Sequence, residues 1–397
     1  DLWLRLQEGL AWIAIKKDPL DVEGDALGDL ANQIEEMSQR VRSLEYRDQK
    51  ANAVRIRGLN AEIAALRTRF ERINLKMSTS MQELRNHQVV MVDANGTERE
   101  IELLEIVRSY RPNQMGLFAK LAYYGERIRE LLLDDPRESN TEGGLFPAIF
   151  GTVMLVFTMS LFSVPLGVIT AVYLREYARE GVLVRLVRIA VYNLAGVPSI
   201  VFGIFGLGFF IYGVGGTIDQ IFYPERLPTP TYGTGGMLWA SLTLALLTVP
   251  VVIVATEEGL TAISRGLREA SFALGATRFQ TLTRVVLPIA MPGIITGFIL
   301  AMARAAGETA PLMITGVVKL APTLAIDGTW PFIHLERKFM HLGFHIYDVG
   351  FQSPNAEAAK PMVYVTTFLL IMIVVFLGLA SIRLRNHLRR QYRGGAF

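Results

Sequence analysis

An arginine and a glutamate lie four residues apart inside an otherwise apolar stretch of the chain. Arg304 and Glu308 fall within residues 291–317, where the local sequence is Ala-Arg-Ala-Ala-Gly-Glu-Thr-Ala-Pro. Counted from Pro292 at about 1.5 Å per residue, Arg304 would lie roughly 18 Å along a helix, close to the middle of a bilayer. An ionisable side chain there costs at least ~2.5 kcal/mol by insertion scales, so a functional role is the first hypothesis.

The chemistry that this pair could perform is the binding of an oxyanion. A guanidinium offers a planar set of N–H donors that can replace the water around phosphate. Glu308 would share a helix face with Arg304 and compete for the same guanidinium. It could also accept a hydrogen bond from a protonated phosphate, which a fully ionised sulfate cannot donate. The alternative is a structural ion pair that braces two helices.

A second candidate site is the polar segment 257–288, which lies between two apolar stretches. It contains Glu269-Ala270-Ser271, then Gly275 after three residues, and Val285-Val286-Leu287-Pro288 after nine more. Small residues along one side favour close packing of a short helix in the groove of a partner. The spacing is similar to the coupling-helix signature of ABC-importer permeases, with Ser271 in place of Ala and Val285 in place of Ile. An ordinary connector between spans is the alternative.

The composition limits the class of protein. The chain has 397 residues, of which 51% are hydrophobic, and it contains no cysteine, which excludes disulfides and thiolate metal sites. A net charge of +3 is too small to suggest a nucleic-acid partner. The sequence contains no Gly-x-x-x-x-Gly-Lys-Ser/Thr phosphate-binding loop, so we expect no ATP chemistry on this chain.

Five apolar segments are long enough, or nearly so, to cross a membrane as helices. They are residues 145–174, 189–214, 237–256, 291–317 and 362–383, so we expect an all-α polytopic membrane domain over 141–397. Arginines gather in 175–188, in 257–288 and after 383, which makes these parts cytoplasmic by the positive-inside rule. Residues 1–140 would then be periplasmic, and we expect a first transmembrane helix before this chain, giving six in all.

The polar segment 1–140 has a helical pattern of its own. Leu30, Ile34, Met37, Val41 and Leu44 repeat at heptad spacing, as do apolar residues from Leu59 to Met77. Over residues 27–86 this predicts an antiparallel helical hairpin, or one long helix with a phase break. A β-hairpin over about 89–103, with a turn at 94–96, and a helix over about 115–134 follow. No catalytic constellation is visible, so we expect a structural or docking insert.

A histidine pair in the last inter-span segment raises the question of a metal. His341 and His345 are four residues apart, with His334 and Asp348 nearby. On a helix, this spacing is that of two zinc ligands. A lone pair is weak evidence, and packing or docking against a binding protein is the favoured interpretation, so we expect no metal site.

Three stretches resemble one transporter family. Residues 301–311, 193–203 and 165–168 look like the PstA type of phosphate ABC-importer permease, in a long form with a periplasmic insert. The likeness covers 143–390 and implies the type I ABC importer permease fold, in which transport follows alternating access. It also implies that the chain is a transporter subunit rather than an enzyme, in the bacterial inner membrane, with the segment 257–288 and the C-terminus in the cytoplasm.

The resemblance also implies partners and site residues. The partners would be a second, PstC-like permease, a dimer of a PstB-like ATPase that holds ATP and Mg, and a PstS-like periplasmic phosphate-binding protein; this chain itself would bind no cofactor. The likeness assigns Arg304, Glu308 and Thr309 to the substrate path. It assigns Glu269, Ala270, Ser271, Gly275, Leu287 and Pro288 to the ATPase contact. The alternatives are a permease for sulfate or molybdate, and a membrane scaffold or signalling protein that uses its periplasmic coiled coil.

Overall fold

The chain forms two compact units. The computed structural model describes residues 2–92, 95–137, 140–328, 330, 332–353 and 356–393. Unit 1 comprises Asp1–Tyr123 and Tyr223–Thr229, and unit 2 comprises Tyr124–Phe222 and Pro230–Phe397. The boundary lies before the expected position at residue 140. The end of helix α3 (Leu117–Leu133) belongs to unit 2, where Leu145 N–H donates to the carbonyl of Leu131 at 2.8 Å.

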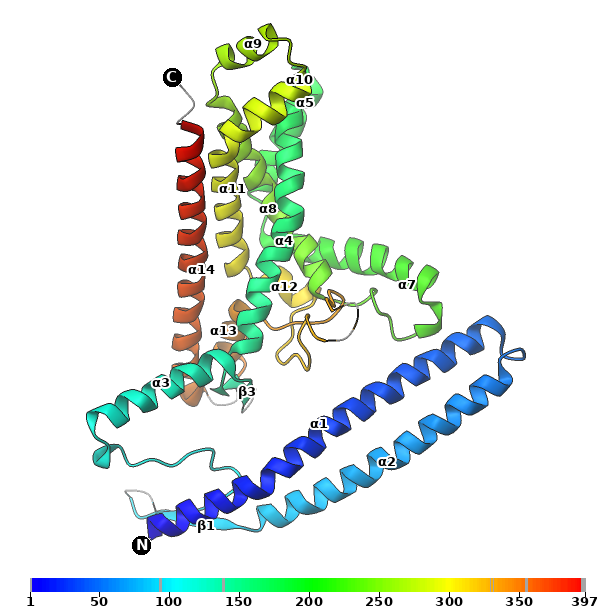
Figure 1. Ribbon diagram of the computed structural model, residues 1–397, viewed down its shortest axis with the longest axis vertical. Coiled ribbons are helices and arrows are strands. Elements are labelled where there is room, and N and C mark those ends of the chain that lie inside the picture. Colours follow the sequence, from blue (N-terminus) through cyan, green and yellow to red (C-terminus); the bar gives the residue numbers. More distant parts are fainter. Residues whose placement is uncertain are drawn as a thin grey trace. The chain divides into compact units, whose positions relative to one another are not determined.

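Unit 1 is built on two long antiparallel helices, α1 (Leu2–Asp48) and α2 (Ala53–Arg85) (Figure 1). Of the two arrangements that the heptads allow, the structure has the hairpin. The turn falls at 49–52, where the Asp48 carboxylate accepts the N–H groups of Lys50 and Ala51. Residues 47–58, between the two heptad runs, are therefore mostly helical. Buried Val41, Ile56 and Ile63 form the centre of the seam, since apolar residues at heptad spacing meet along one line.

A two-stranded hairpin follows the long helices. Strand β1 (Gln88–Val92) pairs antiparallel with β2 (Glu98–Glu102), from Gln88↔Glu102 to Val92↔Glu98. The turn was expected at 94–96, and Ala94 lies outside the described residues. The first half of α1 supports this region, because the Trp12 ring packs edge-on against His87 at 4.8 Å and Gln7 Nε2 donates to Ser109 Oγ at 2.7 Å. The remaining elements here are η1 (Pro112–Gln114) and η5 (Pro224–Arg226).

Unit 2 contains the apolar helices. Among the described residues, five helical segments are long and apolar enough to cross a membrane: Phe146–Tyr177, Ser199–Phe222, Met237–Thr261, Arg278–Gly307 and Ala359–His387. Four of the helices lie side by side: α4 (Phe146–Val172), α8 (Met237–Thr261), α11 (Leu287–Gly307) and α14 (Ala356–Arg393) (Figure 1). Helix α8 packs against α4 and α11, and α11 packs against α14. The short strands β3 (Pro136–Arg137) and β4 (Glu142–Gly143) precede α4.

Two of the expected spans have different bounds. In place of 189–214, the chain forms an amphipathic helix α5 (Val182–Leu194), a break that contains Gly196 and Pro198, and then α6 (Ser199–Phe205), η4 (Gly206–Gly215) and α7 (Gly216–Phe222). In place of 291–317, helix α11 ends at Gly307 and a short α12 (Ala310–Thr315) follows. Both breaks occur at Gly and Pro, whose backbones do not sustain a helix.

Helices α8 and α11 are in backbone contact. A Cβ on Gly293 would lie 2.7 Å from Gly259 Cα, and one on Gly297 would lie 2.9 Å from Ala255 Cβ. Helix α4 approaches α8 in the same way, because a Cβ on Gly167 would meet Val252 at 2.6 Å. In a membrane, small residues of this kind allow helices to associate by close packing. The glycines therefore fix the central layer of unit 2.

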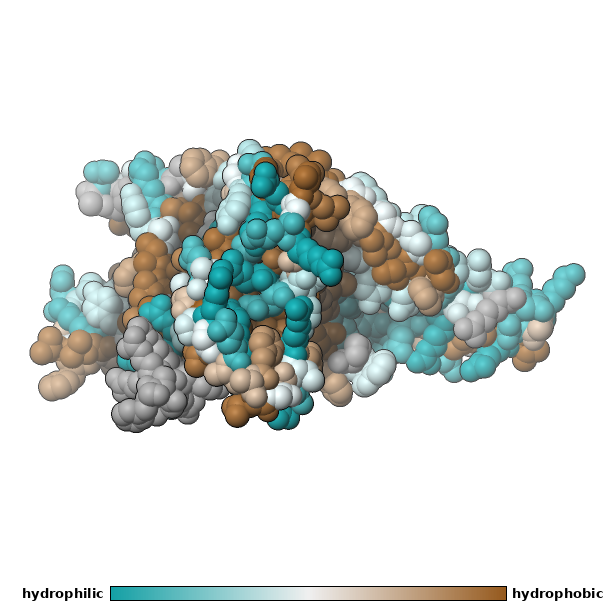
Figure 2. All heavy atoms as spheres, turned by 90° about the horizontal axis from the view of Figure 1, so that it is seen from above, coloured by the Kyte–Doolittle hydropathy of each residue, from teal (hydrophilic) through white to brown (hydrophobic). Residues whose placement is uncertain are grey.

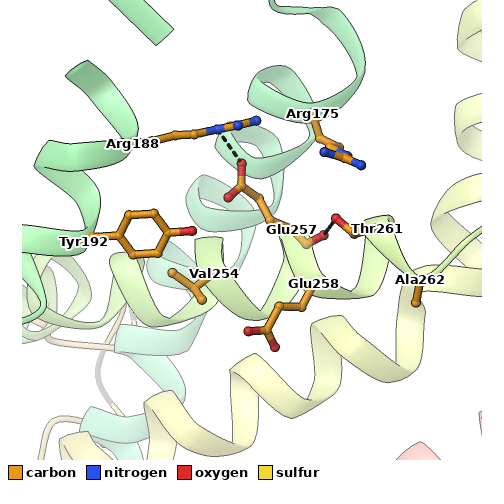
Figure 3. Close-up of a pocket in the computed structure, with 8 residues that line it drawn as sticks. All are labelled: Arg175, Arg188, Tyr192, Val254, Glu257, Glu258, Thr261 and Ala262. Atoms are coloured by element: carbon orange, nitrogen blue, oxygen red, sulfur yellow. Dashed lines mark hydrogen bonds and ion pairs between the residues drawn. The ribbon is translucent and has the colours of Figure 1, made fainter. Parts of the chain in front are cut away.

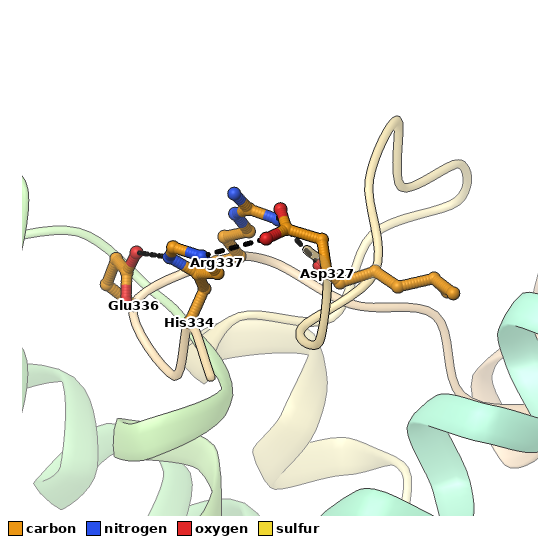
Figure 4. A network of polar contacts seen from close by, with 5 residues as sticks. Asp327, His334, Glu336 and Arg337 are labelled. Carbon is orange, nitrogen blue, oxygen red and sulfur yellow. Dashed lines mark hydrogen bonds and ion pairs between the residues drawn. The ribbon is translucent and has the colours of Figure 1, made fainter. Parts of the chain in front are cut away.

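The segment 316–341 covers the start of α8. This end of unit 2 also holds α13 (Leu342–Phe351) and is called here the α13 end. The first N–H groups of a helix have no partner within the helix. Here Gly236, Met237 and Leu238 donate theirs to the carbonyls of Thr315, Arg337 and Leu335 at 2.7–3.0 Å. A polar network holds this segment in shape. In it His334 lies between Asp327 and Glu336 at 3.2 and 3.1 Å, and Arg337 Nη1 donates to Asp327 at 2.6 Å (Figure 4).

His341 and His345 are buried in α13 and its cap, away from the His334 network. His341 Nδ1 accepts the N–H of Gly343 at 3.1 Å, so the proton of this neutral ring is on Nε2. Thr366 gives its hydroxyl hydrogen to the Met362 carbonyl, so its 3.4 Å contact with His345 Nδ1 requires the proton on Nδ1 there. The two rings therefore differ, since Nε2 carries the proton in His341 and Nδ1 carries it in His345. Among the described residues, no group of three or more His, Cys, Asp or Glu side chains could hold a metal ion.

We predict that Gly293→Ala lowers the thermal stability of the detergent-solubilised protein. The added methyl group must force α11 away from Gly259, and overpacking of this kind costs about 1–3 kcal/mol. Gly378→Ala in α14 is the matched control, because a Cβ there meets nothing within 4 Å and alanine favours helix. Equal melting temperatures for the two variants would contradict the tight contact.

The buried histidines predict loss of stability in mild acid. Burial lowers the pKa of His341 and of His345 from 6.5 to about 4. Below pH 6.5 the unfolded chain binds protons that the folded chain does not bind until about pH 4, so the free energy of unfolding falls across this window and is unaffected above it.

His341→Asn tests this prediction, since asparagine can still accept the Gly343 N–H but does not titrate. Melting curves between pH 7.5 and pH 5 should show a smaller fall for His341→Asn than for the unmodified protein, whereas the exposed His87→Asn should leave the fall unchanged. An identical fall in all three would show that His341 does not contribute.

Candidate functional site

Arg304 and Glu308 come together where a membrane helix is interrupted. Arg304 lies in the last turn of α11, and its Nε is 3.5 Å from Glu308 Oε1, so the expected pairing is confirmed. The helix ends at Gly307, however, and Glu308 has extended backbone angles rather than continuing the helix. Both side chains are partly accessible, at 29% and 19%. The pair is therefore held at a break rather than on one continuous helix face.

The break lies within the depth of the neighbouring helix. Ala305 packs in the same buried cluster as Leu244 and Ala245 of α8, about eight residues after α8 begins. Helices α8 and α11 also meet at Gly259 with Gly293 and at Ala255 with Gly297, so residues further along α11 lie opposite residues nearer the start of α8. The pair therefore lies inside the depth of α8 rather than beyond its start. Pro292 does not begin the helix, because α11 is preceded by helical residues from 278 onward.

The Arg304–Glu308 pair has open space beside it and hydrogen-bond donors that are available to a ligand. A Cβ added to Gly307 would meet nothing within 4 Å, so the space beside the break is open. Thr309 begins α12, and its Oγ1 lies 3.1 Å from the point where Gly343 of α13 would carry a Cβ. Among the described residues, the hydrogen-bond partner of Arg304 is Glu308, which accepts from the Nε–H of Arg304. The other guanidinium nitrogens can therefore bind a further acceptor. This is an arrangement suited to an anion.

At the opposite end of unit 2, here called the α9 end, the predicted coupling motif forms two short helices. Helix α9 (Arg265–Ala273) exposes Glu269 and Ala270, and Ser271 Oγ is 2.9 Å from Thr281 Oγ1. Gly275 follows α9 with φ +84°, a left-handed conformation that favours glycine. Helix α10 (Arg278–Thr281) starts with a capping box between Thr277 and Gln280.

The expected polar loop 257–288 is shorter in the structure. Helix α8 continues through Glu257 and Glu258 to Thr261, and the helical path resumes at Arg278 through α10 and the π-helical turn η6 (Leu282–Val286). Leu287 and Pro288 are the first residues of α11. The two halves of the motif therefore occupy different helices, and the connection between the spans is limited to residues 262–277.

Arg268 holds α9 against the ends of two spans. Its Nη2 donates to the Glu176 carboxylate at 2.8 Å and to the Leu260 carbonyl at 3.0 Å, and its Nη1 donates to the Ile263 carbonyl at 2.8 Å. Glu176 belongs to η3 (Tyr173–Tyr177), which extends α4. Sequence reasoning missed the contact between Arg268 and Glu176, since it joins residues 92 positions apart.

The surface around α9 combines charge with exposed apolar side chains. Seen from the α9 end, hydrophilic residues gather in the middle of the view, with hydrophobic ones at the flanks (Figure 2). The exposed apolar residues of this segment include Leu274, at 90%, with Leu267, Phe272 and Phe279. Such a surface is costly for a free protein in water and favours contact with a partner.

A polar cavity of about 470 Å³ lies between α5 and α8 at the same end. Arg188, Tyr192, Glu257 and Arg175 project into it, and Arg188 Nε is 3.5 Å from Glu257 Oε1 (Figure 3). The sequence places Glu257 and Glu258 at the start of the polar segment 257–288. The structure assigns Glu257 to an ion pair that lets α8 continue past its apolar part.

Comparisons with known proteins agree with this geometry. The model of the family described as binding-protein-dependent transport system inner membrane component matches residues 163–394. Over 172 residues the chain is 40% identical to the phosphate transport system permease protein PstA 1 of Mycobacterium tuberculosis, covering 43% of this chain and 51% of that protein. It is 35% identical over 183 residues to PstA of Yersinia pestis, covering 46% and 56%. The chain thus spans about half the length of these relatives.

Other similarities are to transporters with different names. A probable ABC transporter permease protein, YqgI of Bacillus subtilis, is 34% identical over 223 residues, covering 54% of this chain and 70% of that protein. Among solved structures, an inward-facing MetNI methionine ABC transporter has 21% identity and a TM-score of 0.43, covering 62% of this chain and 94% of that one. A bacterial ABC transporter involved in alginate import has 17% identity and a TM-score of 0.45, covering 69% and 85%.

The family match includes α8, the α9 segment, the interrupted span with Arg304 and all of α14. It extends over more than half of the chain, and the matching relatives reported above from M. tuberculosis, Y. pestis and B. subtilis are named permease proteins. The chain therefore belongs to the binding-protein-dependent transport system inner membrane component family, the multi-pass membrane subunits of such transporters.

Proposed function

We propose that this chain is the permease subunit of an ATP-driven importer of inorganic phosphate and forms one side of its translocation path. The observation that carries the proposal is the Arg304–Glu308 pair, held with open space beside it inside the depth of the spans. Relatives named as phosphate permeases share up to 40% identity with the chain, which favours phosphate over other oxyanions.

The pair has the properties that a transient phosphate site needs. The free guanidinium nitrogens of Arg304 can bind two oxygens of one phosphate. Glu308 would be displaced from Arg304 as the anion binds and would re-form the ion pair as it leaves, which prevents trapping. It also accepts a hydrogen bond from the monoprotonated or diprotonated phosphate that is present near neutral pH. Thr309 Oγ1, at the start of α12, is a further group able to donate to the anion.

The α9 end is the place where an ATPase would act. Glu269, Ala270, Ser271 and Gly275 would lie in the ATPase groove, with the exposed apolar residues around them, and Leu287 and Pro288 would begin the helix that carries the movement. Arg268 ties α9 to α4 and α8. Because residues 278–307 form one helical path, displacement of α9 and α10 would reach the Arg304–Glu308 break, as alternating access requires.

The remaining partners follow from the same proposal. A second, PstC-like permease would complete the path, two PstB-like ATPases would bind ATP and Mg, and a PstS-like protein would deliver phosphate. The α9 end and the C-terminus would be cytoplasmic and unit 1 periplasmic, in a bacterial inner membrane. Permeases for sulfate or molybdate share the need for an arginine, and the carboxylate beside it is what argues against them.

We predict that Arg304→Ala abolishes uptake of labelled phosphate by the reconstituted transporter, and that Glu308→Gln reduces it while the complex still assembles. Excess sulfate or molybdate should not compete in the unmodified transporter. Arg337→Ala is a control for loss of a structural arginine, because its network lies in the 316–341 segment rather than at the break.

The possible results separate the alternatives. Undiminished uptake in assembled Arg304→Ala would make the pair a structural brace. Inhibition by sulfate or molybdate would assign the transporter to another oxyanion. Normal uptake by Glu308→Gln would remove the proposed role of the carboxylate while leaving that of Arg304 in place.

A second prediction concerns coupling. Arg268→Ala removes a partly buried, charge-assisted set of hydrogen bonds, and we expect uptake per ATP hydrolysed to fall by about tenfold while phosphate-independent hydrolysis persists. Arg265→Ala, an exposed arginine in the first turn of the same helix, should leave the ratio unchanged. Equal ratios in both variants would show that the Arg268 contacts do not transmit the movement.

A further inference from the structure

The polar cavity between α5 and α8 contains two buried atoms that lack hydrogen-bond partners. Arg188 Nε and Glu257 Oε1 lie 3.5 Å apart, and neither makes a hydrogen bond within the part of the chain that the structure describes. Buried polar atoms are nearly always hydrogen-bonded to protein, water or a ligand. The N–H of Arg188 therefore needs an acceptor, and the oxygen of Glu257 needs a donor.

Two further polar side chains face the same cavity. Arg175 and Tyr192 line it, and neither forms a hydrogen bond or an ion pair with any residue that the structure describes. The guanidinium of Arg188 also donates from Nη2 to the Leu174 carbonyl at 3.3 Å, which leaves its Nη1 available. The cavity thus offers N–H donors from two arginines and the hydroxyl of a tyrosine.

The two glutamates of the cavity are placed differently. Glu257 turns toward Arg188, whereas the carboxylate of Glu258 is exposed and points away from both arginines (Figure 3). The side chain of Glu257 is only 13% accessible, so it is the carboxylate that a ligand beside the arginines would meet. An ionised carboxylate only accepts hydrogen bonds. The cavity therefore favours a ligand that accepts from the arginines and also donates to Glu257.

A phosphate group with a hydrogen-bond donor has this combination. Its oxygens are strong acceptors for guanidinium groups and for a tyrosine hydroxyl. The donor is the O–H of the hydrogenphosphate ion, or a glycerol hydroxyl in the headgroup of phosphatidylglycerol. A fully ionised sulfate has no hydrogen to donate. The cavity of about 470 Å³ has room for such a group, since one water takes about 30 Å³ in the liquid.

We propose that this cavity binds a phosphate group that carries a hydrogen-bond donor, with Arg175, Arg188 and Tyr192 donating to its oxygens and Glu257 accepting its hydrogen. Arg175 belongs to η3, Arg188 and Tyr192 to α5, and Glu257 to α8, so a bound group connects three elements at the α9 end. The Arg304–Glu308 break is a separate site, and the proposal does not depend on it.

The absence of cysteine from the sequence allows a direct test. Ala262→Cys places a thiol in the wall of the cavity, and Glu180→Cys places one on an exposed segment outside the lining, as the control. The rate of labelling by a negatively charged methanethiosulfonate is measured on the assembled transporter in dodecyl maltoside, which contains no phosphate. Inorganic phosphate, sulfate at equal ionic strength, or phosphatidylglycerol is then added.

We expect inorganic phosphate or phosphatidylglycerol to slow the labelling of Ala262→Cys and to leave that of Glu180→Cys unchanged. At ten times its Kd, a protecting ligand should slow the reaction by about elevenfold, by mass action. Protection by inorganic phosphate would identify the free ion as a ligand, and protection by phosphatidylglycerol would identify the headgroup. Sulfate should protect less than inorganic phosphate.

Variants of the lining keep the test specific. Arg175→Gln and Tyr192→Phe each remove a donor but leave the Arg188–Glu257 ion pair in place, so they should weaken the protection. Arg185→Gln is the matched control, because Arg185 is an exposed arginine of α5 that does not line the cavity.

Three results would overturn the proposal. They are no protection by either form of phosphate, equal protection by sulfate, and loss of the protection in Arg304→Ala. The last result would mean that phosphate acts from the Arg304–Glu308 break, and it would leave the proposed transport function intact.

Discussion

The backbone contact between α8 and α11 is the constraint on which the rest of the membrane unit depends. Gly259 and Gly293 allow the two backbones to approach more closely than any side chain would permit, and Gly167 of α4 makes room for the Val252 side chain of α8. In lipid there is little hydrophobic driving force between helices, so this packing supplies much of their association. With α8 and α11 fixed, both candidate regions are fixed as well, because the α9 segment joins one pair of their ends and the Arg304–Glu308 break lies near the other.

The charged residues of the membrane unit follow from the same packing. Arg188 and Glu257, Arg268 and Glu176, and Arg304 and Glu308 each combine an arginine with a carboxylate where the surroundings are partly closed to water. An unpaired charge at such a place would be costly, and a pair reduces that cost. The three pairs differ in what they join. The first two connect different helices at the α9 end, where Arg188 and Glu257 also line the cavity, whereas the third lies at the break that follows α11.

Unit 1 is held together by its own contacts. The α1–α2 hairpin completes its own seam, and the β-hairpin packs on the first half of α1. Within unit 2, the end of α3 is hydrogen-bonded through its backbone to the start of α4.

The sequence by itself determined the features that depend on local pattern. Apolar length located the five spans, heptad spacing located the helices of unit 1, and a four-residue spacing predicted the Arg304–Glu308 pair. Such patterns can be recognised in the local sequence without knowing which distant residues pack against it. Only the tertiary structure decided that Glu257 stays on α8 beside Arg188, that Arg268 reaches Glu176, and that the heptads fold into a hairpin. Each of these depends on a group distant in the sequence, because a charge or a helix end inside a membrane is stabilised by whatever the fold brings beside it.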